Sequence, residues 1–350
     1  MLRQQRKLDH IEYALKLGQP GITNGFEDIY LINNSLSSLK LDNIDTTCFF
    51  MGKKLQAPLL INAITGGHPS VMNINRSLAR VARQTGIAMA VGSQMSGLEN
   101  SEVKQTYEIA RQENPNGVIL ANLNAGAPPE QAAAAVKMIS ADGLQLYLNI
   151  PQELAMPEGD RDFSGIITNI SEVVSALDVP VIIKEVGSGL SGETIATLYN
   201  MGVRYVDVGG QGGTNFIAIE SMRSGREISN EMLNWGIPTA VSLLEGLGLG
   251  LPIFIIASGG LKTGIDVAKA ITLGAFLAGI AKPFLKELME KSEEALLSKI
   301  DGIIHELRLA MLMSGAENLA QMKKKPVIIT GKVAEWTKCR GIDVSIYAQR

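Results

Sequence analysis

Two linked motifs, VIIKEVG at 181–187 and RYVDVGGQGGTNF at 204–216, hold the clearest structural signal in the sequence. The first opens with an apolar run and places Lys184 where a buried strand should end. The second ends a strand in four closely spaced glycines followed by Thr214, and glycine lets backbone N–H groups approach an anion. We therefore predict that one strand ends in a cation and the next in a phosphate cradle. The alternative is a pair of ordinary strand-to-helix turns with Lys184 in solvent.

Similar apolar runs recur along the chain from residue 58, bounded by Gly, Asn, Ser or Thr and separated by amphipathic segments of helical length. The eight runs are LLINAIT (59–65), IAMAVGS (87–93), VILANLN (118–124), LQLYLN (144–149), VIIK (181–184), YVDV (205–208), FIIAS (254–258) and AFLAGI (275–280). Runs that are apolar on both faces are typical of parallel strands covered by helices. Eight βα units predict an α/β fold closed into a (β/α)8 TIM barrel. An open doubly wound sheet is the alternative, but it does not explain why the count stops at eight.

The regions before and after these runs predict the domain organisation. Residues 1–57 lack the βα repeat, and we interpret them as an N-terminal arm with an amphipathic helix over 3–17 and short strands in 26–57. Residues 58–350 form the barrel, with an insertion at 216–238 after the sixth strand, where a substrate lid would sit. Thr263 and Asp266 predict a capping box at the start of a helix. A long helical pattern through Met313 begins a C-terminal helical extension.

Composition and charge exclude several classes of protein. The formal net charge is −3, so no overall basic field would recruit nucleic acid or an acidic membrane surface. Cys48 and Cys339 are far apart, which argues against a disulfide scaffold or a zinc site and favours a reducing compartment. We find no apolar span of membrane length and no apolar core of a signal peptide. The expected location is the cytoplasm.

In a barrel, the functional face is formed by the residues that follow each strand. These positions hold small hydrogen-bonding residues, one lysine and glycine-rich turns after strands six and seven, near which barrel phosphate sites gather. They predict a phosphate-bearing cofactor with a polar ring system, with Thr65, Ser93 and Asn122 available to the ring. Lys184 could form a Schiff base, or its charge could face the anionic pyrimidine edge of a reduced flavin. The residues alone leave both open.

The loop after the fourth strand, NIPQELAMPEGDRDF (149–163), adds one further group. Gln152 and Glu153 would project from it at the barrel rim, and a carboxylate near bound phosphates commonly holds Mg²⁺. A glutamate simply exposed on the surface is the alternative. Among the histidines, His10 lies on the arm, and we find no Ser-His pair at the strand ends.

Eight motifs together resemble one known family. In chain order they are RKLDHI (6–11), NAITGG (62–67), VGSQM (91–95), LNIPQE (148–153), PEGDRDFSG (157–165), VIIKEVG (181–187), VDVGGQGGTNF (206–216) and IASGGL (256–261). The set spans nearly the whole chain and resembles type 2 isopentenyl-diphosphate isomerase, the flavin-dependent form. The resemblance implies an FMN-binding (β/α)8 barrel, in agreement with the strand count.

The resemblance also implies roles for individual residues. Gln152, Lys184 and His10 would be catalytic, with Gln152 across the substrate from the flavin and Lys184 stabilising the reduced flavin. Glu153 would be the Mg²⁺ ligand. The implied substrate-binding residues are Arg6, Lys7, Ser93, Gln94, Met95 and Gln152. The implied FMN-binding residues are Ala63, Ile64, Thr65, Ser93, Asn122, Lys184, Thr214, Ser258, Gly259, Gly260, Ala281 and Lys282.

Two positions depart from the family pattern. Tyr147 stands where many members have histidine, so a polar neighbour of the substrate is altered. Met95 replaces a common arginine, which leaves more of the diphosphate binding to Arg6, Lys7 and Mg²⁺. We expect both changes to affect affinity more than activity.

The implied reaction is the conversion of isopentenyl diphosphate to dimethylallyl diphosphate in isoprenoid biosynthesis, with no net redox change. Reduced FMN would be the proton-transfer cofactor and NADPH its reductant, and the implied assembly is a homotetramer or homo-octamer. Other FMN barrels are less consistent with the sequence, because 2-hydroxy-acid oxidases need a strand-end histidine and IMP-dehydrogenase-like enzymes a loop cysteine. A Schiff-base aldolase and a flavin-binding sensor without turnover remain as alternatives.

Overall fold

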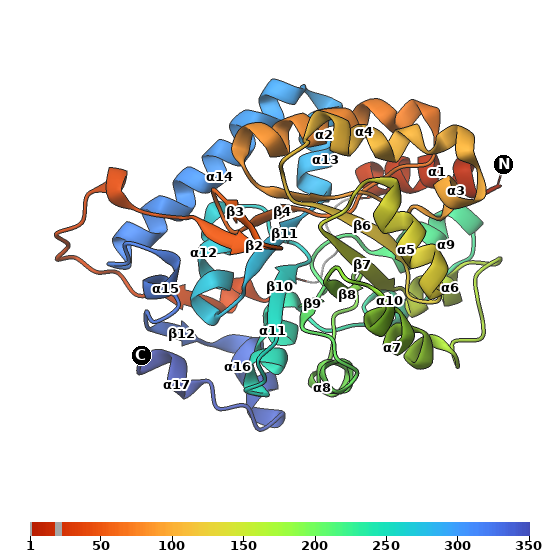
Figure 1. Ribbon diagram of the computed structural model, residues 1–350. Coiled ribbons are helices and arrows are strands. Elements are labelled where there is room, and N and C mark those ends of the chain that lie inside the picture. The colour runs from red at the N-terminus through yellow and green to blue at the C-terminus, as the bar shows by residue number, and fades with distance from the viewer. Residues whose placement is uncertain (1, 18–22) are drawn as a thin grey trace.

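The computed structural model describes residues 2–17 and 23–350, with the backbone alone for residues 2–8. Its centre is a closed barrel of eight parallel strands (Figure 1). In chain order these are β4 (Leu59–Ile61), β5 (Ala88–Ala90), β6 (Ile119–Asn124), β7 (Gly143–Leu148), β8 (Val181–Glu185), β9 (Tyr205–Asp207), β10 (Phe254–Ser258) and β11 (Leu277–Ile280). The ring closes where β11 pairs in parallel with β4. The predicted (β/α)8 barrel is confirmed, and the open sheet is excluded.

Each strand overlaps one of the eight apolar runs, with β7 beginning one residue before its run and β8 ending one residue after. Helices cover the outside of the ring. The covering helices are α2 (Met72–Thr85), α4 (Gln105–Glu113), α5 (Pro129–Met138), α7 (Ile166–Ala176), α8 (Gly192–Asn200), α11 (Thr239–Gly248), α12 (Gly264–Leu273) and α14 (Glu293–Met313). The capping box of Thr263 and Asp266 opens α12, and α14 ends at Met313, both as predicted. The larger part of the hydrophobic core lies between strands and helices.

The inside of the barrel changes character from one end to the other. Near the amino ends of the strands it is packed with apolar side chains, among them Leu60, Ile182 and Ile256. Side chains two residues apart on a strand point to the same face, so Asn62, Lys184 and Ser258 also point inward, one step nearer the carboxyl ends. Tyr205 and Asp207 on β9 have the same two-residue spacing, so the Asp207 side chain points to the same face as that of Tyr205. The two-residue period therefore places a polar layer above an apolar plug.

The segment before the barrel contains α1 (Leu2–Lys16), β1 (Ile29–Leu31) and a hairpin of β2 (Cys48–Phe50) and β3 (Lys53–Leu55). Phe50 and Leu55 of the hairpin join the apolar plug inside the barrel. The helix and short strands predicted for this region are confirmed. The domain boundary itself, at residues 57 and 58, stays a prediction.

A strand of the N-terminal segment and a strand of the C-terminal segment pair beside the barrel. β1 pairs antiparallel with β12 (Val327–Ile329), which precedes α16 (Gly331–Cys339) and α17 (Ser345–Ala348) (Figure 1). Both cysteines are free thiols. None of the helices in the described part of the chain combines the length and apolar character needed to cross a bilayer.

Short helices surround the carboxyl-end rim. They are α3 (Met95–Glu99), α6 (Ile150–Ala155), α9 (Phe216–Ser224), α10 (Asn230–Leu233) and α13 (Lys282–Glu290), with α15 (Leu319–Met322) farther away. The predicted insertion thus consists of α9, α10 and their connections. Because α9 contacts both α1 and α6, the insertion joins the N-terminal helix to the rim.

Candidate active site

A cavity of about 1180 Å³ opens at the carboxyl ends of the strands. It exceeds the roughly 300–1,000 Å³ typical of a site for one small molecule, so it has room for two ligands. It brings together sixteen of the residues that the sequence predicted, namely His10, Ala63, Ile64, Thr65, Ser93, Met95, Asn122, Gln152, Glu153, Lys184, Thr214, Ser258, Gly259, Gly260, Ala281 and Lys282.

One predicted residue, Gln94, does not line this cavity, and two others have side chains outside the described residues. Gln94 is fully buried away from the cavity, where its Nε2 donates to the Ala135 carbonyl (3.0 Å) and its Oε1 accepts from the Asn122 N–H (3.0 Å). Gln94 therefore supports the cavity wall from behind through these two hydrogen bonds. Arg6 and Lys7 lie on α1, and their side chains are outside the described residues.

The turns after β9 and β10 pack against each other through glycine backbone. Gly259 has φ +110°, and a Cβ there would lie 2.1 Å from the Gly210 carbonyl oxygen. The φ of Gly260 is +83°, and its Cβ would lie 2.4 Å from the carbonyl oxygen of Gly212. Any side chain at these positions would force the turns apart. The glycines of both turns and the first turn of α13 line the same part of the cavity, and bare backbone beside the start of a helix suits a phosphate.

Lys282 begins α13 on the same side of the cavity. Its Nζ donates to the Leu17 carbonyl (2.6 Å), which ties the end of α1 to the rim. Burial lowers the pKa of Lys282, and the nearby charges of Lys286 and Lys262 lower it further. A group of cations that repel one another is stabilised by an anion, so this end of the cavity favours a negatively charged ligand.

Two buried polar atoms on the opposite wall have no hydrogen-bond partner among the described residues. They are Oγ1 of Thr65 and Oδ1 of Asn122, and both residues line the cavity. An unpaired polar atom in the interior is destabilising unless a ligand or water satisfies it. This wall therefore suits a ligand with a polar ring, while the glycine turns suit its phosphate.

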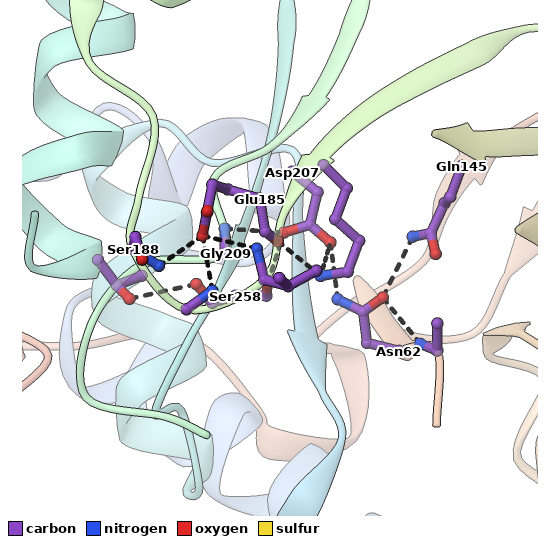
Figure 2. Close-up of polar contacts among 12 residues, drawn as sticks. Asn62, Gln145, Glu185, Ser188, Asp207, Gly209 and Ser258 are labelled. Carbon is purple, nitrogen blue, oxygen red and sulfur yellow. Dashed lines mark hydrogen bonds and ion pairs between the residues drawn. The ribbon is translucent and has the colours of Figure 1, made fainter. Parts of the chain in front are cut away.

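Four inward-pointing residues, Asn62, Lys184, Asp207 and Ser258, form what we term the floor cluster (Figure 2). Asp207 accepts hydrogen bonds from Asn62 Nδ2 (2.6 Å), Lys184 Nζ (3.2 Å) and the Ser258 hydroxyl. All four side chains are more than nine-tenths buried. The predicted cation at the end of β8 is thus an ammonium paired with a carboxylate.

Glu185, the next residue of β8, is held in a different way. Its Oε2 accepts the backbone N–H groups of Val186 (2.6 Å), Gly187 (2.7 Å) and Ser188, so the loop wraps around one oxygen (Figure 2). Burial raises the pKa of Glu185 to about 7, against the lowering effect of those N–H groups. Backbone dipoles only partly replace the water that this carboxylate has lost.

A second buried carboxylate, Glu220 of α9, organises the rim. It accepts hydrogen bonds from His10 Nε2 (2.7 Å), Gln152 Nε2 (3.1 Å) and Arg223 Nε (2.6 Å). Burial favours a higher pKa for Glu220, but these hydrogen bonds outweigh it and lower the pKa to about 2. We term His10, Gln152, Glu220 and Arg223 the mouth cluster. It joins α1, α6 and α9 through one negative charge.

Glu153 lies beside the mouth cluster on α6. Its Oε1 accepts from Asn149 Nδ2 (2.8 Å) and its Oε2 from the Asp160 N–H (3.0 Å). Arg161 orders the same loop, because it donates to the carbonyls of Glu153, Met156, Gly159 and Asp160. Within the described part of the chain, no group of three His, Cys, Asp or Glu residues could hold a metal ion alone. A metal ion at Glu153 would therefore take its other ligands from water, from amide or carbonyl oxygens, or from a bound molecule.

The two residues that depart from the family pattern both line the cavity. Tyr147 donates its hydroxyl to Ser93 Oγ (3.3 Å), which links the ends of β7 and β5. Met95 begins α3 next to them.

Sequence reasoning missed Asn62, Asp207 and Glu220 as parts of the site. Asn62 and Asp207 could have been found in the sequence, because each is a polar residue inside an apolar run. Like Lys184, each lies two residues after a side chain that points into the barrel. Glu220 gave no such signal, because it lies in an insertion and depends on a contact with α1, some 210 residues earlier.

The profile of a family described as FMN-dependent dehydrogenase matches residues 150–329. A relative from Moorella thermoacetica, named isopentenyl-diphosphate delta-isomerase, is 49% identical over 338 residues, or 97% of each chain. The chain belongs to the flavin-dependent, type 2 isopentenyl-diphosphate delta-isomerase family. The resemblance seen in the sequence is thereby confirmed.

Other members of the isomerase family are similar over the whole length. Those from Symbiobacterium thermophilum and Methanothermobacter thermautotrophicus are 46% and 42% identical, covering 100% and 99% of this chain and 99% of each relative. Solved structures of mandelate oxidase and flavocytochrome b2 share the fold at 16% and 19% identity, each with a TM-score of 0.65. The match with mandelate oxidase covers 94% of this chain and 98% of that protein. The match with flavocytochrome b2 covers 86% of this chain and 76% of that protein. At such low identity the likeness shows the barrel and nothing more about this isomerase family member.

Proposed function

We propose that the chain interconverts isopentenyl diphosphate and dimethylallyl diphosphate, with reduced FMN as the proton-transfer cofactor, in isoprenoid biosynthesis. The observation that supports this most strongly is one cavity with a phosphate cradle, an ion-paired lysine and a mouth cluster, in a member of the isomerase family. The substrate's reacting end is hydrocarbon, so side-chain carboxylates have little on it to hydrogen-bond. A cofactor that exchanges protons with carbon meets that need.

The described residues fit FMN. Its phosphate suits the bare turns at Gly259 and Gly260 with Thr214, Ala281 and Lys282, and its ring suits the wall at 63–65, Ser93 and Asn122. The unpaired oxygens of Thr65 and Asn122 provide polar groups that such a ring would satisfy. When bound and reduced, FMN supplies an N5 position that exchanges a proton with an alkene carbon. The protein supplies orientation and charge.

Gln152 would face the substrate with its amide held in one orientation. Its Nε2 donates to Glu220, and its Oε1 accepts from Asn149 Nδ2 at 3.3 Å. His10 is fixed by the same carboxylate and by edge-on contact with Phe216, whose ring centre is 5.8 Å away. We propose that these two side chains confine the alkene and exclude bulk water, so that protons reach only the intended carbons.

For the diphosphate we propose Arg6 and Lys7 as contacts, while Ser93 and Met95 would line the substrate's part of the cavity. Glu153 would hold Mg²⁺ by a single carboxylate. Magnesium commonly binds through one or two carboxylates plus substrate phosphates and keeps several waters, so we expect the ion to enter with the diphosphate. Gln94 is left out, since its amide is fully used behind the wall.

Three further proposals rest on the resemblance alone. NADPH would reduce the flavin, the chain would assemble as a homotetramer or homo-octamer, and it would act in the cytoplasm. An absorbance change on anaerobic addition of NADPH and light scattering in solution test the first two.

The environment of Lys184 disfavours the Schiff-base aldolase. A nucleophilic amine must be neutral, whereas this Nζ donates to the Asp207 carboxylate and to the Glu185 carbonyl, both at 3.2 Å. An ammonium with two acceptors is suited to stabilising negative charge.

The test of the proposed function is anaerobic conversion. The purified protein with reduced FMN and Mg²⁺ should form dimethylallyl diphosphate from isopentenyl diphosphate, and in heavy water the product should carry deuterium by NMR. A protein that holds reduced FMN but leaves the substrate unchanged would contradict the proposal and favour a flavin-binding sensor.

Gln152→Leu tests the residue assigned to the substrate side. We expect turnover to fall at least about 100-fold, because the variant loses the only group that the mouth cluster presents from α6, and oriented groups are worth several kcal/mol. Flavin absorbance should be retained, since Gln152 is not among the residues assigned to FMN. Unchanged turnover would remove Gln152 from the mechanism.

A further inference from the structure

We propose that Asp207 is a positioning residue that holds the Lys184 ammonium at the cavity floor and balances its charge. A bound cofactor then faces an oriented ion pair in place of a lone cation. The inference rests on the proposed function only in that the cavity takes FMN. Its test reads the flavin directly and does not depend on isomerase turnover.

Asp207 collects hydrogen bonds from four neighbouring parts of the rim (Figure 2). Its Oδ2 accepts from Asn62 Nδ2 at 2.6 Å and from Lys184 Nζ at 3.2 Å. Its Oδ1 accepts from the Ser258 hydroxyl and from the Gly209 N–H at 3.2 Å. These donors come from β4, β8, β10 and the turn after β9. A carboxylate with four donors is fixed in place and fixes them in return.

Lys184 and Asp207 differ in their access to the cavity. Lys184 lines the cavity, whereas Asp207 has no exposed surface and lies behind it. The carboxylate cannot touch a ligand and must act through its partners. The Lys184 ammonium has two acceptors, and the second, the Glu185 carbonyl at 3.2 Å, carries no net charge. Asp207 therefore supplies the counter-charge.

Asn62 extends the influence of Asp207 to the opposite wall. While its Nδ2 is bonded to Asp207, its Oδ1 accepts from the Ala63 N–H (3.0 Å) and from Gln145 Nε2 (3.1 Å). The amide is therefore held in one orientation, and it pins the start of the wall at 63–65. The same carboxylate thus positions the lysine and the segment assigned to the flavin ring.

Glu185 also interacts with the charge of Lys184, which acts against the effect of burial and favours a lower pKa for Glu185. Its Oε2, however, accepts the backbone N–H groups of the loop at 186–188, and the direct ion pair of Lys184 is with Asp207. Asp207 is thus the carboxylate that neutralises Lys184. Charges interact strongly in a buried site because water does not screen them, so the balance of this pair should govern how well negative charge on a reduced flavin is tolerated.

Counting charge at the floor predicts an order for four proteins. The wild type is neutral there, Asp207→Asn leaves one positive charge, Lys184→Met leaves one negative charge, and the double variant is neutral again. A net positive floor favours the anionic reduced flavin. The ratio of reduced to oxidised flavin at a fixed potential should be highest in Asp207→Asn, lowest in Lys184→Met, and similar in the wild type and the double variant.

The experiment measures the midpoint potential of the flavin in each holoprotein. We expect the ratio in Asp207→Asn to rise about tenfold, which corresponds to about 30 mV for a two-electron couple. We expect the double variant to lie closer to the wild type than to Lys184→Met. Glu245→Gln is the matched control, since Glu245 is also buried but is paired with Trp336 and Arg340 away from the cavity. It should leave the ratio unchanged.

Three results would overturn the proposal. The first is an Asp207→Asn protein of lower stability with an unchanged or lower potential, which would make the residue purely structural. The second is a double variant that behaves like Lys184→Met. The third is failure of both Asp207→Asn and the double variant to fold. Removing both charges of a buried pair is usually tolerated better than removing one, so folding of the double variant alone would support the pairing.

Discussion

Two buried glutamates of the rim, Glu220 and Glu185, are held in opposite electrostatic settings. Glu220 receives hydrogen bonds from side chains, including His10 and Arg223, and its pKa is lowered to about 2. Glu185 receives backbone N–H groups of its own loop, and burial raises its pKa to about 7. Both are more than nine-tenths buried. The comparison teaches that burial alone does not decide how a carboxylate titrates, because the hydrogen bonds that it accepts also shift its pKa.

The two settings also differ in what they join. The partners of Glu220 lie on α1, α6 and α9, which are separate in sequence and outside the barrel ring. The partners of Glu185 are the three residues that follow it. Loss of the first charge therefore releases three elements from one another, whereas loss of the second charge relaxes one loop.

The largest effect expected from this comparison is on catalysis. Glu220→Gln should lower turnover at least about 100-fold, because it removes the charge that orients His10 and Gln152, and breaking a buried pair costs about 3–5 kcal/mol. FMN should remain bound, since Glu220 does not line the cavity. Steady-state kinetics and the flavin spectrum measure both effects.

Glu158→Gln is the matched control for Glu220→Gln. Glu158 pairs with the same arginine, Arg223, but from the exposed side. We expect less than about a threefold change in turnover, as for other exposed pairs. Equal losses in the two variants would mean that Arg223, and not the buried carboxylate, organises the mouth cluster.

The second effect is on stability in acid. Because the pKa of Glu220 falls from 4.5 in the unfolded chain to about 2 in the folded chain, its stabilising contribution is present above pH 4.5. That contribution is lost as the pH falls toward 2, and its full size is about 3 kcal/mol. Urea unfolding of the wild type and Glu220→Gln at pH 6, 4 and 3 should show that the difference between their free energies of unfolding becomes smaller as the pH falls. A difference that is constant with pH would contradict the charged state assigned here.

The smallest expected effect is the contribution of Glu185 to stability, which depends on pH in the opposite direction to that of Glu220. Glu185 has a raised pKa in the folded chain, so its contribution is fully present below pH 4.5 and is lost as the pH rises through about 7. The free energy of unfolding of the wild type, relative to Glu185→Gln, should fall by about 1–2 kcal/mol between pH 4.5 and 8. We expect less than the full linkage value because local opening of the loop can hydrate the carboxylate. A relative stability that rises over this interval would refute the assignment.

The barrel was predictable because its strands are buried on both faces and therefore appear as unbroken apolar runs. Most of the cavity was predictable for a related reason. Parallel strands bring their carboxyl ends to one rim, so residues such as Thr65, Asn122 and Lys184 had to converge there once the ring closed.

Other parts of the site could not be read from motifs. Gln94 belongs to a motif whose flanking residues Ser93 and Met95 line the cavity. The chain turns into α3 at Gln94, with φ −85° and ψ 0°, and its side chain is buried behind the wall. Glu220 depends on contacts between distant segments that no local pattern encodes. Asp207 could in principle have been recognised, because it is an acidic residue within an apolar run and lies two residues after Tyr205, on the same face of the strand.

The pairing of β1 with β12 sets an order of events during synthesis. A ribosome adds residues one after another, so β1 waits without its partner strand until residues 327–329 have emerged. The helix that carries His10 precedes β1 and also contacts α9 and α13. The ring itself closes once β11 has formed beside β4. Products truncated before residue 327 should therefore keep a closed barrel but leave β1 without its partner strand.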